Sequence, residues 1–380
     1  GGYGREMLAP FSDLDILFLH NNELNQKKLR NFIQTLLYPL WDLGLQVGYA
    51  VRNIEESRYY SNKDHVIQTS MLETRFICGN KKIFFRVVDE FKESIKKSGY
   101  KLIKDKIKER TKRVIEKGYD YFKNEPNLKE TAGSLRDVNL IFWILNIYKI
   151  INSSTTNTPS DLLTKKEKRI LNNSLEFLLL LRCHLHYQSG RMNDVLSFDY
   201  QLTISEKFFN FNSKNNFVDK NTFTEKMMKK YFIHIKNIKN FDEIFSQILD
   251  ELFNKKLKKI KENIFIDDPN KFFSHYLYRI QSGKDDANDK RILLECIDKL
   301  DKSKILTKRN LLIIRKIFFS KNKEKFNLLY DLGILSKIVP EFSKISFLPQ
   351  FDRFHSLTVG QHTLKAVNIL KELDGKQIKK

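Results

Sequence analysis

Two acidic residues near the start of the chain have a spacing that suits a bound metal ion. Asp13 and Asp15 lead into an apolar run over residues 16–19 that is typical of a β-strand. Alternate residues of a strand point to the same side, so both carboxylates would face one place, while Leu14 and Ile16 would face a core. Two such close carboxylates repel each other unless a positive charge lies between them, and Mg²⁺ prefers oxygen ligands.

The residues before the acid pair suit phosphate binding. Gly1 and Gly2 allow backbone N–H groups to approach a phosphate closely, and Ser12 adds a hydroxyl beside the acids. An isolated Asp-x-Asp also occurs in ordinary polar turns that lead into strands. The glycine pair, the serine, the acids and the strand together favour a nucleotide site.

These residues also resemble the signature of a known superfamily. Residues 1–5 read Gly-Gly-x-Gly-Arg and residues 10–15 read Pro-x-Ser-Asp-x-Asp. This pattern resembles the polymerase-β-like nucleotidyltransferases, and more narrowly the bacterial PII uridylyltransferase/uridylyl-removing enzymes. The resemblance implies transfer of UMP from UTP to a tyrosine of the PII nitrogen-signalling protein, with release of pyrophosphate. It implies catalysis and Mg²⁺ (or Mn²⁺) binding by Asp13 and Asp15, and nucleotide binding by Gly1, Gly2, Arg5 and Ser12.

Two further segments are candidates for the same site. Superfamily sites often take a third carboxylate from a neighbouring strand, but the predicted strand over residues 45–52 contains no acid. Glu73 is the nearest candidate, in a segment that matches the family and looks helical. Residues 124–137 resemble a family loop, with Ala132 and Ser134 replacing a proline and a glycine. A basic residue of that loop would contact the nucleotide, or the segment is simply a helix N-cap.

The last informative segment, residues 351–364, resembles the entry to the family's HD phosphohydrolase domain. His362 matches the first metal-ligand histidine of that domain. The remaining ligands do not follow, and a single ligand does not hold a metal, so we expect the uridylyl-removing site to be incomplete in this chain. Because Gly1 already lies inside a motif, we expect the sequence to be a piece of a longer protein, truncated at both ends.

The remaining pattern predicts mostly helices. Apolar spacing predicts a helix over residues 24–43, ended by Gly44, and long helices over residues 81–120. Residues 139–256 also look helical, and residues 282–290 look like a linker. We therefore predict an α+β fold: a nucleotidyltransferase domain over residues 1–120, a helical domain over residues 121–340, and the start of an all-α HD domain over residues 341–380.

Composition limits the class of protein. The 380 residues carry a net charge of +22, but the lysines are spread along the whole chain, which favours solvated helix faces over a nucleic-acid surface. The three cysteines are far apart, which fits a reducing cytoplasm rather than a disulfide framework. No apolar stretch reaches the length of a membrane span.

We expect UTP and the PII protein as partners. Two alternatives stay open at this point. The first is a nucleotidyltransferase with another acceptor, such as glutamine synthetase, a tRNA end or a small molecule. The second is a non-catalytic chain that only binds a nucleotide or PII.

Overall fold

The computed structural model describes residues 1–21, 25–118, 120–153, 162–208, 220–254, 268–284, 286–349 and 357–372. Within them the chain is mostly helical, with one small sheet. This agrees with the predicted α+β class. No helix in the described ranges is long and apolar enough to cross a membrane. The three cysteines, Cys78, Cys183 and Cys296, are free thiols.

The sheet consists of two parallel strands, β1 (Leu14–Leu19) and β2 (Val47–Arg52). Parallel strands need a crossover connection, and α1 (Gln26–Asp42) supplies it. Asn25 caps this helix by accepting hydrogen bonds from two backbone N–H groups, and Gly44 follows it with a φ of +77°. The predicted strand, helix and glycine stop are all confirmed. In the register of the sheet, Asp15 lies opposite Gly48.

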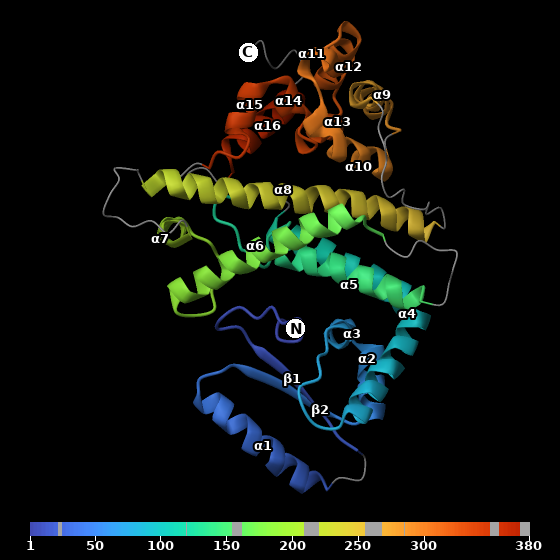
Figure 1. The fold of residues 1–380 in the computed structure, drawn as a ribbon, viewed down its shortest axis with the longest axis vertical. Helices are drawn as coiled ribbons and strands as arrows, with labels where there is room; N and C mark the ends of the chain where they lie inside the picture. The colour runs from blue at the N-terminus through green and yellow to red at the C-terminus, as the bar shows by residue number, and fades with distance from the viewer. Residues whose placement is uncertain are drawn as a thin grey trace.

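Helices that follow the sheet connect it to a helical bundle. After α2 (Ile54–Lys63) and α3 (His65–Leu72), the chain forms α4 (Lys81–Lys117), a single helix where several were predicted. The bundle then continues with α5 (Leu135–Ile151), α6 (Lys165–Ser189), α7 (Phe198–Phe208) and α8 (Lys220–Phe253). One hydrophobic core runs from α3 and α4 through these helices. Figure 1 shows the sheet at one end of α4 and the bundle at the other.

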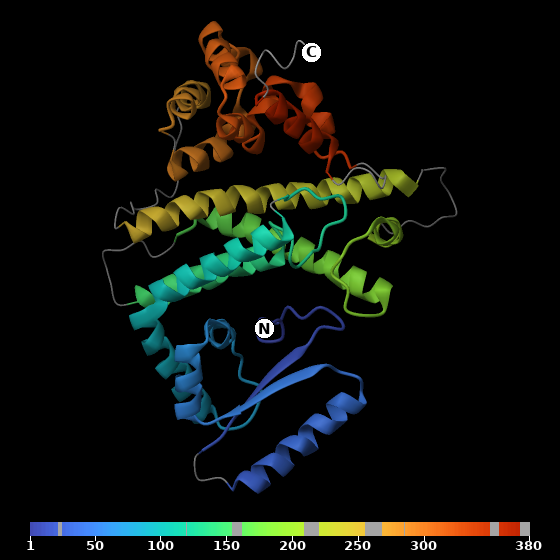
Figure 2. The ribbon, with the colours of Figure 1, turned by 180° about the vertical axis from the view of Figure 1, so that it is seen from behind.

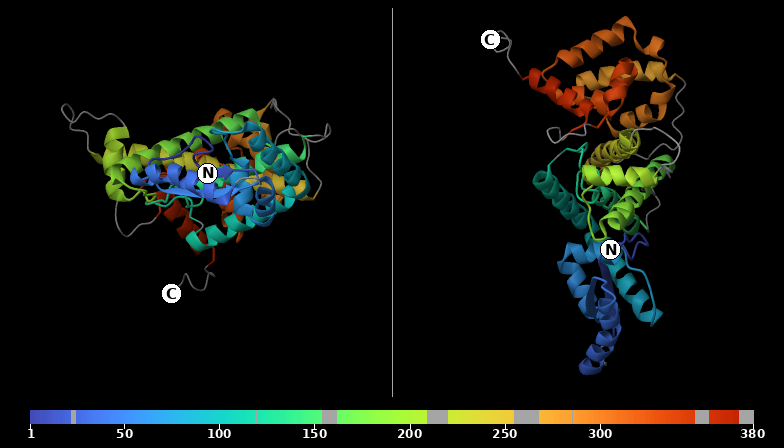
Figure 3. Two further views of the ribbon diagram at one scale, coloured as in Figure 1. Left: turned by 90° about the horizontal axis from the view of Figure 1, so that it is seen from below. Right: turned by 90° about the vertical axis from the view of Figure 1, so that its left-hand side faces the viewer.

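The C-terminal helices lie on the far side of α8 from the sheet (Figures 1 and 2). They are α9 (Pro269–Ser282), α10 (Ala287–Cys296), α11 (Lys302–Ile305), α12 (Lys308–Phe319), α13 (Lys323–Asp331), α14 (Ile334–Ile338), α15 (Pro340–Ile345) and α16 (Val359–Leu370), with a 3-10 turn over Ile297–Lys299. A second core, formed by α9 to α14, is distinct from the first. The molecule is thus elongated, with sheet, bundle and C-terminal helices in succession (Figure 3).

Three local predictions differ from the structure. Leu14 and Ile16 are only half-buried, while Leu17 and Leu19 pack against the main core. The face of β1 that carries the acids therefore also faces the bundle. Residues 282–290 are not a linker, because α9 ends at Ser282 and Asp286 already caps α10. The segment around Glu73 is not helical, because α3 ends at Leu72.

Candidate active site

A cavity of about 290 Å³ lies where the N-terminal loop meets the bundle. The six residues predicted from the N-terminal motif all line it: Gly1, Gly2, Arg5, Ser12, Asp13 and Asp15. The remaining wall comes from α3 to α6 and the loops beside them. Figure 2 shows the N-terminus between the sheet and the bundle, where both can contribute to one site. The structure therefore brings the predicted residues together, and adds a wall that the motif did not contain.

The two acids have no polar partner among the described residues. Asp13 immediately precedes β1 and Asp15 is its second residue, and both side chains are exposed. Neither carboxylate makes a hydrogen bond or an ion pair within the described residues. Acidic side chains that stabilise a fold are usually paired, so an unpaired acid pair in a cavity is available for an external cation.

The loop before the acids is tightly folded and strained. The Met7 N–H donates to the Gly2 carbonyl at 2.9 Å, and Glu6 and Phe11 adopt positive φ values of 62° and 57°. Such conformations cost on the order of 1–3 kcal/mol each and are common at functional sites. The Ser12 hydroxyl is buried and has no hydrogen-bond partner in the described structure. A ligand oxygen in the cavity would satisfy it.

Close packing explains two of the glycines. A Cβ atom on Gly1 would lie 2.4 Å from a carboxylate oxygen of Asp15, and one on Gly4 would lie 2.0 Å from the backbone carbonyl of Glu73. The first distance shows that the backbone of Gly1 lies directly beside the Asp15 carboxylate, with no space for a side chain. The second distance shows that Gly4 packs against the backbone just after α3. A larger residue at position 4 would displace the loop from α3.

Glu73 is held by two donors. Arg5 Nη1 lies 2.5 Å from Glu73 Oε2, and the Trp143 indole N–H donates to Oε1. The Glu73 side chain is only 7% exposed. Its carboxylate therefore lines the cavity, but both oxygens are already engaged. This arrangement orients Arg5, whose buried Nε has no partner.

The bundle supplies a basic wall opposite the acids. The cations lining this side are Lys106 on α4, Lys129 in the loop before α5, Arg136 on α5 and Arg182 on α6. Lys106 pairs with Glu109 at 2.6 Å, Arg136 with Glu130 at 2.7 Å, and Arg182 with Asp194 at 2.6 Å. In the predicted loop over residues 124–137, Ser134 occupies the N-cap position of α5 without a side-chain capping bond, and Lys129 and Arg136 line the cavity. A contact of this loop with a nucleotide stays a prediction.

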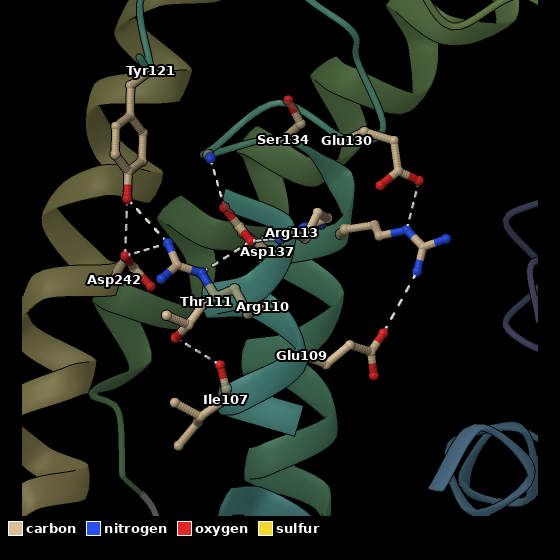
Figure 4. Close-up of polar contacts among 12 residues, drawn as sticks. Ile107, Glu109, Arg110, Thr111, Arg113, Tyr121, Glu130, Ser134, Asp137 and Asp242 are labelled. Carbon is tan, nitrogen blue, oxygen red and sulfur yellow. Dashed lines mark hydrogen bonds and ion pairs between the residues drawn. The ribbon is translucent and has the colours of Figure 1, made fainter. Parts of the chain in front are cut away.

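A buried ion network fixes the start of α5 (Figure 4). Asp137, 1% exposed, accepts the Gly133 N–H at 2.6 Å and pairs with Arg110 and Arg113 of α4. Arg110 also pairs with Asp242 of α8 at 2.6 Å. Burial opposes the charged guanidinium, but the two acids outweigh it and raise the pKa of Arg110 above its ordinary value. Asp137 is therefore structural.

A second buried contact ties the N-terminal loop to α6. The ring of His186 is fully buried, with Nδ1 against the Pro10 carbonyl and Nε2 3.1 Å from Asp194 Oδ1. No local pattern of the sequence reveals this partner, because the two residues are 176 positions apart. His186, Asp194 and Arg182 together connect the basic wall to the residue two positions before Ser12.

Comparisons with known proteins show which enzymes the chain resembles. Residues 101–246 match the family model described as GlnD PII-uridylyltransferase. A "Bifunctional uridylyltransferase/uridylyl-removing enzyme" of Phenylobacterium zucineum (strain HLK1) is 30% identical over 408 residues, which cover 98% of this chain and 43% of that protein. The enzyme of the same name from Azospirillum brasilense is 29% identical, with the same coverage of both chains. The chain is therefore similar to the PII-uridylyltransferase family over nearly its whole length.

The similarity to PII-uridylyltransferases includes the helical wall, and the alignments to the two relatives extend it to nearly the whole chain. The family model begins within α4 and ends within α8, so it contains Lys106, Lys129, Arg136 and Arg182, while the two relatives also align with nearly all the rest. The chain spans less than half the length of these relatives. No solved structure matches it.

The donor set fits a metal only together with a ligand. Within the described ranges, no group of three or more His, Cys, Asp or Glu side chains is arranged to hold a metal ion. Asp13 and Asp15 supply two oxygen-bearing groups, and Mg²⁺ is commonly completed by substrate phosphates and water. The two unpaired acids beside the buried Ser12 hydroxyl therefore fit a metal–phosphate complex rather than a metal alone.

The HD segment is far from this cavity in the chain. His362 is exposed on α16, and residues 351–356 of the segment lie outside the described residues. His362 does not line the cavity of Asp13 and Asp15. A role for it in uridylyl removal stays a prediction.

Proposed function

We propose that this cavity catalyses transfer of UMP from UTP to a tyrosine of a PII signalling protein. The observation that carries the proposal is the set of cavity groups that have no partner within the described ranges: the Asp13 and Asp15 carboxylates and the Ser12 hydroxyl. These groups match what a metal-bound nucleotide requires. The family and the names of the relatives supply the nucleotide and the acceptor.

In the proposed reaction the tyrosine oxygen attacks the α-phosphorus of UTP. The bond from the α-phosphorus to the tyrosine oxygen forms, the α–β phosphoanhydride bond breaks, pyrophosphate leaves, and the tyrosine loses its proton. Asp13 and Asp15 would hold Mg²⁺ or Mn²⁺, which neutralises phosphate charge when bound. Gly1, Gly2 and Ser12 contact phosphate oxygens, and Arg5, oriented by Glu73, adds a guanidinium.

We further propose the domain roles predicted from the sequence. Residues 1–120 contribute the acid pair and Lys106, residues 121–340 the rest of the basic wall, and residues 341–380 the beginning of an HD domain in which His362 is one metal ligand.

The test determines which nucleotide base and which acceptor the chain uses. The chain is incubated with Mg²⁺ and α-labelled UTP or ATP, with either a PII protein or RNA as acceptor. We expect label on PII from UTP and little from ATP, and a Tyr→Phe change at the modified position of PII should abolish it. Label on RNA instead of PII would overturn the proposed acceptor.

A further inference from the structure

Among the cationic side chains that line the cavity, Lys129 differs from the others in its partners. Arg5, Lys106, Arg136 and Arg182 each have a carboxylate within ion-pair distance. Among the described residues, the Lys129 ammonium makes no ion pair and no hydrogen bond, although it lines the same cavity. Its charge is therefore available to a ligand.

The backbone of Lys129 is fixed, so the free ammonium is not a consequence of a loose loop. Asn127 Oδ1 accepts the N–H groups of Lys129 at 3.0 Å and Glu130 at 2.7 Å. The neighbouring Leu128 is fully buried, and its N–H donates to the Asp194 carbonyl at 2.8 Å. The Lys129 side chain itself is half-buried. A flexible side chain on a rigid anchor suits binding of an anion in the cavity.

The nearby Asp194 carboxylate has hydrogen-bond partners other than Lys129. Lys129 attracts Asp194 through space, but the Asp194 carboxylate already accepts bonds from Arg182 and His186. Across the cavity, Asp13 and Asp15 repel a triphosphate unless cations offset their charge. Lys129 approaches the cavity from the loop before α5, whereas the acids belong to the start of β1, so the two lie on different walls.

We propose that Lys129 binds the β- and γ-phosphates of the nucleotide, and so contributes from the helical region the cation that neutralises the leaving pyrophosphate. This inference rests on the proposed function. It assigns the ligand of this residue as a diphosphate group carrying at least two negative charges, so UTP and UDP should contact it and UMP should not.

The experiment measures nucleotide affinity rather than activity. Calorimetric titrations with Mg-UTP, Mg-UDP and UMP compare the unmodified chain with Lys129→Met, Lys129→Arg and Lys149→Met. The last is the matched control, an exposed lysine of α5 outside the cavity. Loss of one charged hydrogen bond should weaken Mg-UTP binding by Lys129→Met at least about tenfold. UMP binding should stay within about twofold, and Lys129→Arg should retain most of the affinity for Mg-UTP.

The outcomes separate the two proposals. If the unmodified chain binds Mg-UTP and Lys129→Met binds it equally well, the role of Lys129 is wrong while the nucleotide site stands. Equal weakening of UMP and UTP would also reject the assignment to the β- and γ-phosphates. If the unmodified chain binds none of the three nucleotides, the proposed function itself fails. Unfolding temperatures of the variants should match that of the unmodified chain, because the Lys129 ammonium makes no ion pair or hydrogen bond with the described residues and Asp194 keeps its bonds to Arg182 and His186.

Discussion

Asp13 and Asp137 are both acids of family-like motifs, but their surroundings differ completely. Asp137 is buried and receives one backbone and two arginine contacts, whereas Asp13 is exposed and, in the described part of the chain, unpaired. A saturated carboxylate contributes to stability, and an unsaturated one in a cavity is available for function. The sequence alone placed both residues in motifs and did not distinguish these roles.

Replacing an acid by Asn should therefore have different effects on stability in the cavity and in the buried ion network. Asp13→Asn or Asp15→Asn should leave the unfolding temperature unchanged or slightly higher, because no ion pair is lost and mutual repulsion is relieved. Asp137→Asn should lower the free energy of unfolding by about 3–5 kcal/mol, as expected when one partner of a buried pair is removed. Urea unfolding of the three variants measures this. A comparable loss in all three would contradict the distinction.

A substitution of Glu73 tests whether it is the third carboxylate of the site. Glu73→Gln keeps the acceptor for Trp143 but removes the charge that holds Arg5. We expect transfer to fall about tenfold, the scale of one lost ion-paired contact, while the Mg²⁺ concentration for half-maximal activity stays unchanged. A large increase in the Mg²⁺ requirement would instead make Glu73 a metal ligand.

Contacts between distant elements explain what the sequence did not predict. Strand, helix and cap patterns predicted β2, α1 and the ends of α1 because these depend on neighbouring residues. The basic wall depends on how α4, α5 and α6 pack against the N-terminal loop, and no local spacing encodes that packing. His186 is the clearest case, since its contact with Pro10 joins residues 176 positions apart in the chain.

The connection through Asp194 should make stability depend on pH. Burial opposes its charged form, but the hydrogen bond and charge of Arg182, helped by His186, hold the pKa of Asp194 below its ordinary value. A lowered folded-state pKa gives stability that is present above about pH 4, the unfolded value, and is lost as pH falls through the folded value. The difference in unfolding free energy between the unmodified chain and Asp194→Asn should thus be constant from pH 7 to 5 and shrink below pH 4. Urea titrations at each pH measure it, and a constant difference down to pH 3 would contradict this role.

In the described part of the chain, α8 belongs to the main core, and the C-terminal helices form two further cores. Arg291 of α10 pairs with Glu167 of α6 at 2.7 Å, a buried contact between the C-terminal helices and the bundle. A second contact joins α8 to α13, where Lys239 lies 2.6 Å from Asp331 and 3.9 Å from Glu243. The sequence predicted helices across this region but not that a core boundary falls between α8 and α9.

Ionisation of the Glu243 carboxyl at this junction should lower the free energy of unfolding as pH rises. Burial, with the nearby charge of Asp331, raises the pKa of Glu243 to about 7, although Lys239 acts in the opposite direction. The folded chain then binds more protons than the unfolded chain between about pH 4.5 and 7, so the free energy of unfolding should fall across that interval. We expect a loss on the order of 2 kcal/mol, which Glu243→Gln should remove. Thermal unfolding from pH 4.5 to 8 tests this, and identical pH profiles for the two chains would reject it.

The most direct test of the proposed site is UMP transfer by the unmodified chain and by Asp15→Asn under the same conditions. Labelled UTP, Mg²⁺ and a PII protein are supplied, and the label on PII is measured over time, with circular dichroism confirming that the variant is folded. We expect the unmodified chain to label PII and Asp15→Asn to be slower by at least about a hundredfold, the scale for losing a main electrostatic stabiliser. Equal labelling by the two chains would contradict the assignment of the cavity as the site of transfer.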